Sequence, residues 1–261
     1  MEKKQFESVR NKRRPKGTLS PYNINFLHLR SSWVMIWWAA SYLGFAYVSL
    51  GAYIKGFILI FLEFFLNVQA KLNLGIFYSL TGQFDMAKQV LDTKWLLFYV
   101  PIYVAIMWGA SRTATDLNKY SILADREESV VFPFAMNSLD IAFLDKRNPW
   151  LAVVLSLLAP GLGHLYTHRV VTTSFLIMFW WLVTAVKSSF FQCVHLTATG
   201  HFAQAIAVSD PQWLLFLPSI YVYAIHDSYI NTIHYNQLHS QEQQRYLIDN
   251  YQNANFPMPT R

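Results

Sequence analysis

The amino-acid sequence contains an internal repeat, with an offset of 117 to 118 residues between the two copies. Three blocks occur twice in the same order: I-x-F-L-x-x-R-x-x-W, T-G-x-F-x-x-A-x-x-V-x-D and W-L-L-F-x-x-x-I-Y-V. They begin at Ile24, Thr81 and Trp95 in the first copy and at Ile141, Thr199 and Trp213 in the second. Ordered matches at a nearly constant offset indicate a tandem duplication. A period this long is typical of a duplicated domain and not of a solenoid unit.

Both copies are strongly apolar. Hydrophobic residues make up 54% of the 261 residues and charged residues only 14%, whereas a soluble domain carries about 25% charged residues. We therefore expect the protein to lie in a lipid bilayer. The single cysteine, Cys193, excludes an internal disulfide and a cysteine-based metal site.

Six apolar stretches, three in each copy, are each about 16 to 18 residues long. They cover about residues 33–50, 53–68, 95–110, 149–166, 170–186 and 213–227. At 1.5 Å per residue, this is the lower end of the length that spans a hydrocarbon core of about 30 Å. The expected fold is an all-α, polytopic membrane protein of two tandem three-span repeats, with about six transmembrane helices in total.

This interpretation divides the chain into five parts. They are a basic cytoplasmic tail (1–32), membrane repeat 1 (33–110), an aqueous linker (111–148), membrane repeat 2 (149–227) and a polar C-terminal tail (228–261), the last with a helix around 238–248. In each repeat a less apolar segment, 73–94 or 188–212, contains the T-G-x-F block. This block predicts a short amphipathic helix, which either lies at the membrane interface or packs on its own bundle.

The charge distribution predicts the orientation. Eight Lys and Arg residues lie in the first 32 positions, which predicts a cytoplasmic amino terminus and a first span retained as a signal-anchor. Six crossings return the carboxyl terminus to the cytoplasm. An odd number of spans per repeat inverts the second copy relative to the first, as in many transporters. The five basic residues of the linker then lie outside, and two spans per repeat would remove this conflict. The expected location is the cell membrane, as a bacterial cytoplasmic membrane protein.

Four residues are candidates for function. Glu63 is the one acidic residue well inside an expected span, so it either marks a functional site, paired with Lys55 or Lys71, or is protonated and bonded to a neighbouring helix. His226 and Asp227 end the last span, either as a proton-handling pair or as a polar end in water.

His164 is the fourth candidate, and His168 follows it at the i, i+4 spacing of a metal-binding pair. No third ligand is evident in the sequence, and zinc requires at least three protein ligands as a rule. We therefore expect no metal and no other cofactor. The net charge of +6 is explained by the basic tail, so we expect no nucleic-acid partner either.

The segment around His164 is the most distinctive local string, P-G-L-G-H-L-Y from Pro160 to Tyr166. It resembles small membrane proteins in which P-G-x-G-[QH]-x-Y ends one span and a short turn leads into the next. It is also similar to two-span hairpin domains that carry G-x-G-x-H-x-[FY]. The resemblance covers about 20 residues per repeat, and the first copy lacks the proline and the histidine. It implies a membrane hairpin and no particular reaction.

No nucleophile with a matching base is marked by local sequence, so we expect no enzyme. The favoured function is that of an integral membrane scaffold or accessory subunit, which binds other membrane proteins or a second copy of itself. Nine Trp and 20 Phe residues provide more aromatic surface than six short helices bury internally. The alternative is a small inverted-repeat transporter, for which Glu63 is the polar site near mid-membrane.

Overall fold

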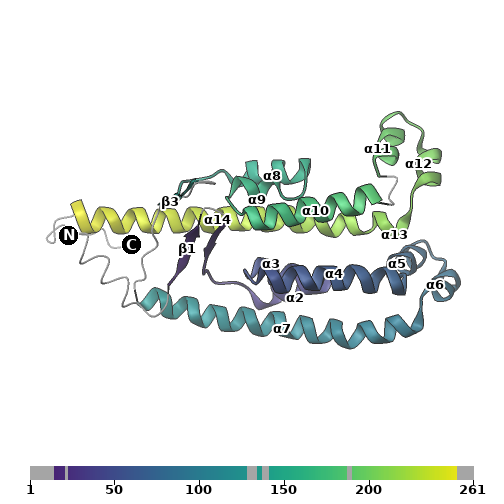
Figure 1. Ribbon diagram of the computed structural model, residues 1–261, viewed down its shortest axis with the longest axis horizontal. Coiled ribbons are helices and arrows are strands. Elements are labelled where there is room, and N and C mark those ends of the chain that lie inside the picture. Colours follow the sequence, from purple (N-terminus) through teal and green to yellow (C-terminus); the bar gives the residue numbers. More distant parts are fainter. Residues whose placement is uncertain (1–14, 21–22, 128–133, 137–140, 187–189, 252–261) are drawn as a thin grey trace.

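The computed structural model describes residues 15–20, 23–127, 134–136, 141–186 and 190–251. The protein is mostly helical, with two small antiparallel hairpins of two strands each. Figure 1 shows an elongated molecule in which the long helices lie along the same axis. The strands lie toward one end, here called the strand end. The short helices α5, α6, α11 and α12 lie at the other, here called the far end.

Residues 17–126 and 134–251, here called the first and second halves, have the same order of elements, except that the second half has one additional short helix before its last helix. The first half contains β1 (Gly17–Ser20), β2 (Asn23–Phe26), α2 (Ser32–Ser41), α3 (Phe45–Ser49), α4 (Tyr53–Ala70), α5 (Leu72–Leu80), α6 (Phe84–Val90) and α7 (Thr93–Arg126). The second half contains β3 (Phe134–Met136), β4 (Ile141–Phe143), α8 (Pro149–Leu158), α9 (Leu162–Tyr166), α10 (Val170–Val186), α11 (Phe190–Ala198), α12 (Phe202–Val208), α13 (Pro211–Leu214) and α14 (Phe216–Tyr251). The T-G-x-F block forms α6 and α12, which confirms the short helices expected there.

The first apolar stretch of each half is a pair of short helices and not a single span. In the second half, Asn148 caps α8 by accepting from the Trp150 backbone N–H at 3.0 Å. The helix ends before Pro160, which has no N–H to continue it, and Gly161 turns the chain with φ 110°. Helices α8 and α9 then pack on each other. Ten residues rise only about 15 Å, half of a hydrocarbon core, so the expected spans at 33–50 and 149–166 are wrong.

Among the described residues, two helices are long and apolar enough to cross a membrane, α4 and α7. A third crossing is present if α10 and α11, which meet at a bend of 74°, form one broken span. Two to three candidate spans are therefore present. The six-span count is not reached by length and apolarity.

Two long helices continue past the expected boundaries. Helix α7 begins after Asp92, whose carboxylate accepts from the backbone N–H groups of Lys94 and Trp95 at 3.0 and 3.3 Å. It runs through the expected aqueous linker as far as Arg126. Helix α14 runs through the expected polar tail to Tyr251, because residues 219–251 contain neither Gly nor Pro.

Equivalent helices of the two halves point the same way (Figure 1). Helices α4 and α10 run from the strand end to the far end, and α7 and α14 run back. The expected inverted pair is therefore wrong for this structure. The physical reason is that the first apolar stretch of each half turns back on itself, so each half returns the chain to the end at which it entered.

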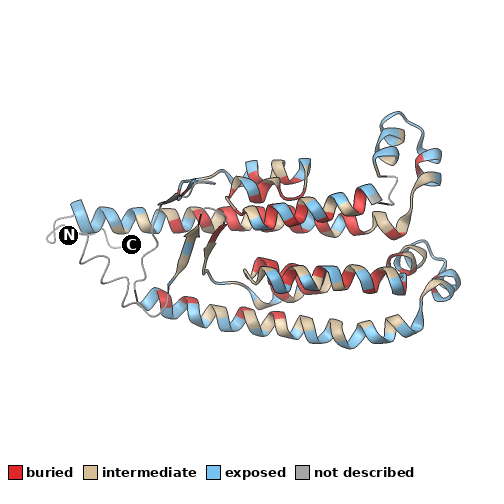
Figure 2. Cartoon of the chain, viewed as in Figure 1, coloured by how far each residue is buried: buried red, intermediate tan, exposed pale blue. Residues whose placement is uncertain are grey.

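Aromatic packing between the halves forms the main core. Phe45 stacks on Tyr223 with ring centroids 4.1 Å apart, and Phe57 stacks on Phe175 at 3.8 Å. Figure 2 shows buried residues concentrated on α3, α4, α10 and α14, whereas α7 is mostly exposed or half-buried. Each buried aromatic side chain removes about 150–250 Å² from solvent, so this seam contributes much of the association between the halves.

The amino-terminal segment is partly folded, which corrects the expectation of a simple basic tail over residues 1–32. Strand β1 pairs with β2 in antiparallel register, with Gly17 opposite Phe26. Ile24 is buried in a second, smaller core with Ala142, Leu144 and Tyr235. The all-α expectation is therefore corrected to a mostly helical fold with four short strands among the described residues.

Candidate functional site

A buried ion cluster joins the two halves, here called the Asp227 site and formed by Ser49, His164, Arg169, Tyr223 and Asp227. The Asp227 carboxylate is 3% exposed. Its Oδ2 accepts from Arg169 Nη1 at 2.6 Å and lies 3.0 Å from His164 Nε2. Its Oδ1 accepts from Ser49 Oγ at 2.5 Å. Both carboxylate oxygens are thus satisfied, as a buried charge requires.

Four elements position this cluster. Ser49 is the last residue of α3, His164 lies in α9, and Arg169 directly precedes α10. Tyr223 and Asp227 are one turn apart on α14, and the Tyr223 hydroxyl lies 3.2 Å from Ser49 Oγ. The ring nitrogen Nδ1 of His164 has no hydrogen-bond partner in the described part of the chain. His164 Nε2–H therefore donates to the carboxylate, and the site carries one cation and one anion.

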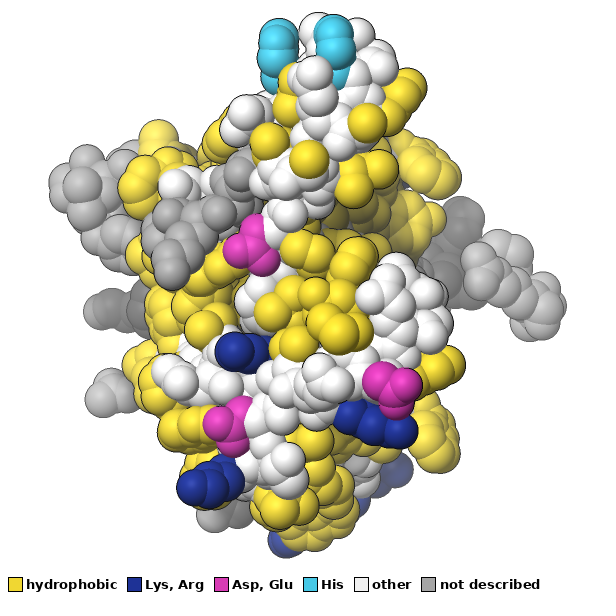
Figure 3. All heavy atoms as spheres, turned by 90° about the vertical axis from the view of Figure 1, so that its right-hand side faces the viewer, with side chains coloured by type: hydrophobic (Ala, Val, Ile, Leu, Met, Phe, Trp, Pro, Cys, Tyr) yellow, Lys and Arg dark blue, Asp and Glu magenta, His cyan; other side chains and the backbone are white. Residues whose placement is uncertain are grey.

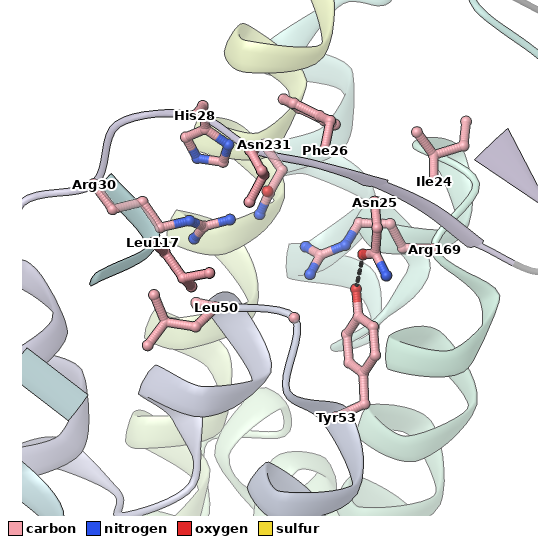
Figure 4. Close-up of a pocket in the computed structure, with 13 residues that line it drawn as sticks. Ile24, Asn25, Phe26, His28, Arg30, Leu50, Tyr53, Leu117, Arg169 and Asn231 are labelled. Atoms are coloured by element: carbon pink, nitrogen blue, oxygen red, sulfur yellow. Dashed lines mark hydrogen bonds between the residues drawn. The ribbon is translucent and has the colours of Figure 1, made fainter. Parts of the chain in front are cut away.

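A cavity of about 150 Å³ lies beside the cluster, here called the arginine cavity. It is lined by Ile24, Asn25, Phe26, Leu27, His28, Arg30, Ser49, Leu50, Gly51, Tyr53, Leu117, Arg169 and Asn231. In Figure 4 the guanidinium groups of Arg30 and Arg169 point into this space from opposite sides. Tyr53 Oη donates to Asn25 Oδ1 at 2.5 Å on the Arg169 side.

The main chain of Arg30 is held by Asn118 of α7. Asn118 Oδ1 accepts from Arg30 N at 2.8 Å, and Asn118 Nδ2 donates to Arg30 O at 2.7 Å. Burial lowers the pKa of Arg30 to about 10; the charge of Asp227 opposes this shift and that of Arg169 adds to it. The group stays cationic at pH 7 despite its position beside a second arginine.

His28 lines the arginine cavity, and its ring stacks on that of His234 of α14 with centroids 3.9 Å apart. Burial, assisted by the charges of Arg30 and of His234, lowers the pKa of His28 from 6.5 to about 2. The imidazole is therefore neutral at pH 7. The positive charge at the cavity comes from the two arginines alone.

Glu63 lies in a separate cavity of about 400 Å³ between the halves. The side chain is 4% exposed, and its Oε1 accepts from Tyr99 Oη at 3.0 Å. Its Oε2 has no partner among the residues placed by the structure. The expected pairing with Lys55 or Lys71 is wrong, since Tyr99 is the partner of Oε1 and Oε2 has none among the described residues. The ammonium of Lys55 instead lies 4.1 Å from the ring centre of Tyr47.

The structure brings together two of the four candidates, His164 and Asp227. Asp227 is buried and bonded to His164 and Arg169, so it forms neither a pair with His226 nor a polar end in water. The ring of His226 lies against Trp38 at 4.9 Å between centroids. His168 occupies a turn with φ 58°. No group of three His, Cys, Asp or Glu side chains in the described residues could hold a metal ion.

Sequence reasoning missed Ser49, Arg30 and Arg169. A signal for one of them was available in a comparison of the two copies. At the offsets of the repeat, His164, Arg169 and Asp227 correspond to Tyr47, Ala52 and Gly109. The second copy therefore has an arginine, an aspartate and a histidine at three positions where the first copy has none of these. The three side chains contact one another in the structure.

Comparison of the chain with known protein families, with curated proteins and with solved structures gives no match.

Proposed function

We propose that this chain is a multi-pass membrane scaffold or accessory subunit, built from two parallel copies of one unit and without catalytic activity. The observation that carries the proposal is that both carboxylate oxygens of Asp227 have hydrogen-bond partners. Its carboxylate is bonded on both oxygens by groups from both halves. A carboxylate held in this way joins the two halves and is not free to act as a general acid or base.

Matching hydrogen bonds support the description as two copies. Asn118 holds the backbone of Arg30, and Asn236 holds the backbone of Arg147 in the same two-bond pattern, at 2.8 and 2.7 Å. These residues correspond at the offsets of the sequence repeat. The common order and direction of the helices agree with this correspondence (Figure 1).

The basic residues support an orientation with the strand end in the cytoplasm. Lys119 and Arg126 lie in the last turns of α7. Arg30 lies two residues before α2 and Arg169 directly precedes α10, so all four lie toward the strand end. The described basic residues toward the far end are Lys71, Lys88 and Lys94. Charged and hydrophobic side chains are mixed on the far end face (Figure 3), as at a membrane–water interface. Both termini and the segment between the halves are then cytoplasmic, in a cell membrane.

Helix α7 supplies the surface that supports a binding role. It packs mainly on α2 and α4 at one edge of the bundle. Only 6% of its apolar 18-residue stretch is buried. Its exposed side chains include Leu97, Phe98, Val104 and Trp108, which are 55 to 69% exposed. Aromatic and aliphatic side chains in this arrangement suit a helix of another membrane protein or of a second copy.

Cysteine cross-linking in the native membrane tests the scaffold proposal. The lone Cys193 is replaced by Ser, and Val104→Cys is introduced on α7. A stoichiometric cross-linked product is expected, and its mass distinguishes a second copy from a different partner. Leu158→Cys is the matched control, because it is 69% exposed on α8 of the second half. Equal and sparse products from both variants would contradict a docking role for α7.

A small transporter is the second candidate, and the free oxygen of Glu63 supports it. The cavity that this carboxylate faces is lined by α2, α4, α5 and α7 of the first half and by α14 of the second half. Parallel repeats related by an axis along the membrane normal also occur in transporters. Reconstituted vesicles test this candidate: solute flux that is lost in a folded Glu63→Gln variant would favour transport over scaffolding.

A further inference from the structure

We propose that the arginine cavity binds a phosphoryl group and that Arg30 and Arg169 bind its anionic oxygens. The cavity lies at the strand end, so its assignment to the cytoplasmic side rests on the proposed orientation. The binding chemistry itself rests only on the residues that line the cavity.

The charges around the cavity do not balance. Arg169 is neutralised by Asp227 at 2.6 Å. Arg30 is half-buried and makes no side-chain hydrogen bond or ion pair with any residue that the structure describes; its guanidinium projects into the cavity (Figure 4). A half-buried cation that has lost part of its hydration and has no counter-charge is held at a free-energy cost. An anion in the cavity would remove this cost.

The equivalent arginine of the second half, Arg147, has partners within the chain, although its Nε has none among the described residues. Arg147 Nη1 donates to the carbonyl oxygen of Tyr166. The Arg147 guanidinium also lies over the rings of Tyr166 and Tyr235, at 5.2 and 5.8 Å from their centres. The backbones of Arg30 and Arg147 are held alike, so the two side chains start from equivalent positions. The one in the first half is directed into a cavity in place of an internal partner.

The lining supplies the donors that a phosphoryl group requires. Two guanidinium groups offer forked N–H donors, which match phosphate oxygens better than single ammonium groups do. Tyr53 donates to Asn25 Oδ1, so Nδ2 is the remaining donor of that amide. The volume of about 150 Å³ is far above the roughly 15 Å³ that one water needs on the same measure. A tetrahedral group of five heavy atoms therefore fits.

Rigid surroundings favour binding over collapse of the cavity. Asn118 fixes the Arg30 backbone, and Asp227 fixes Arg169 from the opposite side. Asn231 donates from Nδ2 to the Asp227 carbonyl oxygen at 2.6 Å. An anion would enter a site whose cationic groups are already placed, so little ordering of side chains accompanies binding.

The test uses the full-length chain, purified in a mild detergent in phosphate-free buffer at low salt. One arm titrates inorganic phosphate by calorimetry. The other arm measures retention of phosphatidic acid or phosphatidylcholine by native mass spectrometry. One phosphoryl group per chain is expected. Binding of inorganic phosphate points to a soluble phosphorylated ligand, and selective retention of phosphatidic acid points to a lipid headgroup.

Variants of the arginine separate a specific site from general attraction. Arg30→Gln should weaken binding by about tenfold to a hundredfold, the effect of losing charge-assisted hydrogen bonds. Arg112→Gln is the control, since it removes the same charge from an exposed position over the ring of Trp108. Arg30→Lys keeps the charge and loses the fork, and serves if Arg30→Gln does not fold. Absence of phosphoryl binding, or equal weakening by Arg30→Gln and Arg112→Gln, would overturn the proposal, whatever the cross-linking of α7 shows.

Discussion

Tyr47 lies directly against Gly109, so that a Cβ atom added to Gly109 would come within 2.6 Å of the tyrosine hydroxyl oxygen. These two residues correspond, at the offsets of the repeat, to His164 and Asp227. The first half therefore fills with one tyrosine and a glycine the position at which the second half holds a buried histidine–carboxylate pair. The ion cluster is therefore a difference between the first and second halves.

The contact between Tyr47 and Gly109 predicts that the effect of Gly109→Ala on stability changes sign when Tyr47 is replaced. Ala is usually better than Gly inside a helix by about 0.5–1 kcal/mol. Tyr47 is buried and cannot move aside freely, so Gly109→Ala should instead destabilise the protein by about 1–2 kcal/mol, as overpacking does. In a Tyr47→Phe background the same change should be stabilising. Thermal unfolding in detergent of the four proteins checks this, and equal effects in both backgrounds would contradict the contact.

Loss of the Asp227 carboxylate should be far more damaging than loss of an exposed one. Asp227→Asn leaves Arg169 buried without a counter-charge, which is expected to destabilise the protein by about 3–5 kcal/mol. Adding Arg169→Gln should restore part of this loss, because the unpaired cation is then removed. Asp85→Asn is the control, since its carboxylate lies 3.8 Å from Lys88 in a solvent-exposed pair and contributes little. The free energy of unfolding is the measurement. A double variant no more stable than Asp227→Asn would argue against an ion-pair role.

A local signal in the sequence predicted the short helices correctly. The T-G-x-F block forms α6 and α12, because the start of a short helix depends on neighbouring residues. The stretches 33–50 and 149–166 were wrongly expected to span the membrane. Hydropathy measures composition and not direction, so a helical hairpin with an apolar turn has the same profile as one long helix.

The site was less accessible from the sequence than the fold. His164 and Asp227 were both candidates, but they lie 63 residues apart and no local pattern pairs them. Arg30 was visible only as a repeated residue of the first block. Its distinction from Arg147 arises from the neighbours of each side chain, Tyr166 and Tyr235 in the second half and a cavity in the first. That distinction depends on tertiary packing alone.

His28 is expected to make the stability of the protein fall as the pH falls. Its folded-state pKa is lowered to about 2 by burial, Arg30 and His234, against weak opposition from the Phe26 backbone and Asp227. The unfolded chain binds this proton near pH 6.5 and the folded protein does not. The contribution of neutral His28 to the free energy of unfolding is therefore fully present above pH 6.5. Below pH 6.5 the free energy of unfolding falls by up to about 1.4 kcal/mol per pH unit.

Thermal unfolding between pH 8 and pH 5 checks the role of His28. The His28→Gln variant should lose less stability over this range than the wild type does. His201→Gln, at an exposed position before α12, should keep the wild-type slope. Identical slopes for the wild type and His28→Gln would show that His28 is accessible to protons in the folded protein.

The parallel arrangement predicts which ends of the helices a membrane-impermeant reagent reaches. In a Cys193→Ser background, Lys88→Cys lies on α6 at the far end and Lys119→Cys lies near the end of α7 at the strand end. Because basic residues concentrate toward the strand end, that end should be cytoplasmic. Lys88→Cys should therefore react with an impermeant maleimide on intact cells, and Lys119→Cys only after the membrane is opened. Both are exposed, so access alone decides the result. Labelling of Lys119→Cys from outside would reverse the orientation, and labelling of both from the same side would show that α7 does not cross the membrane.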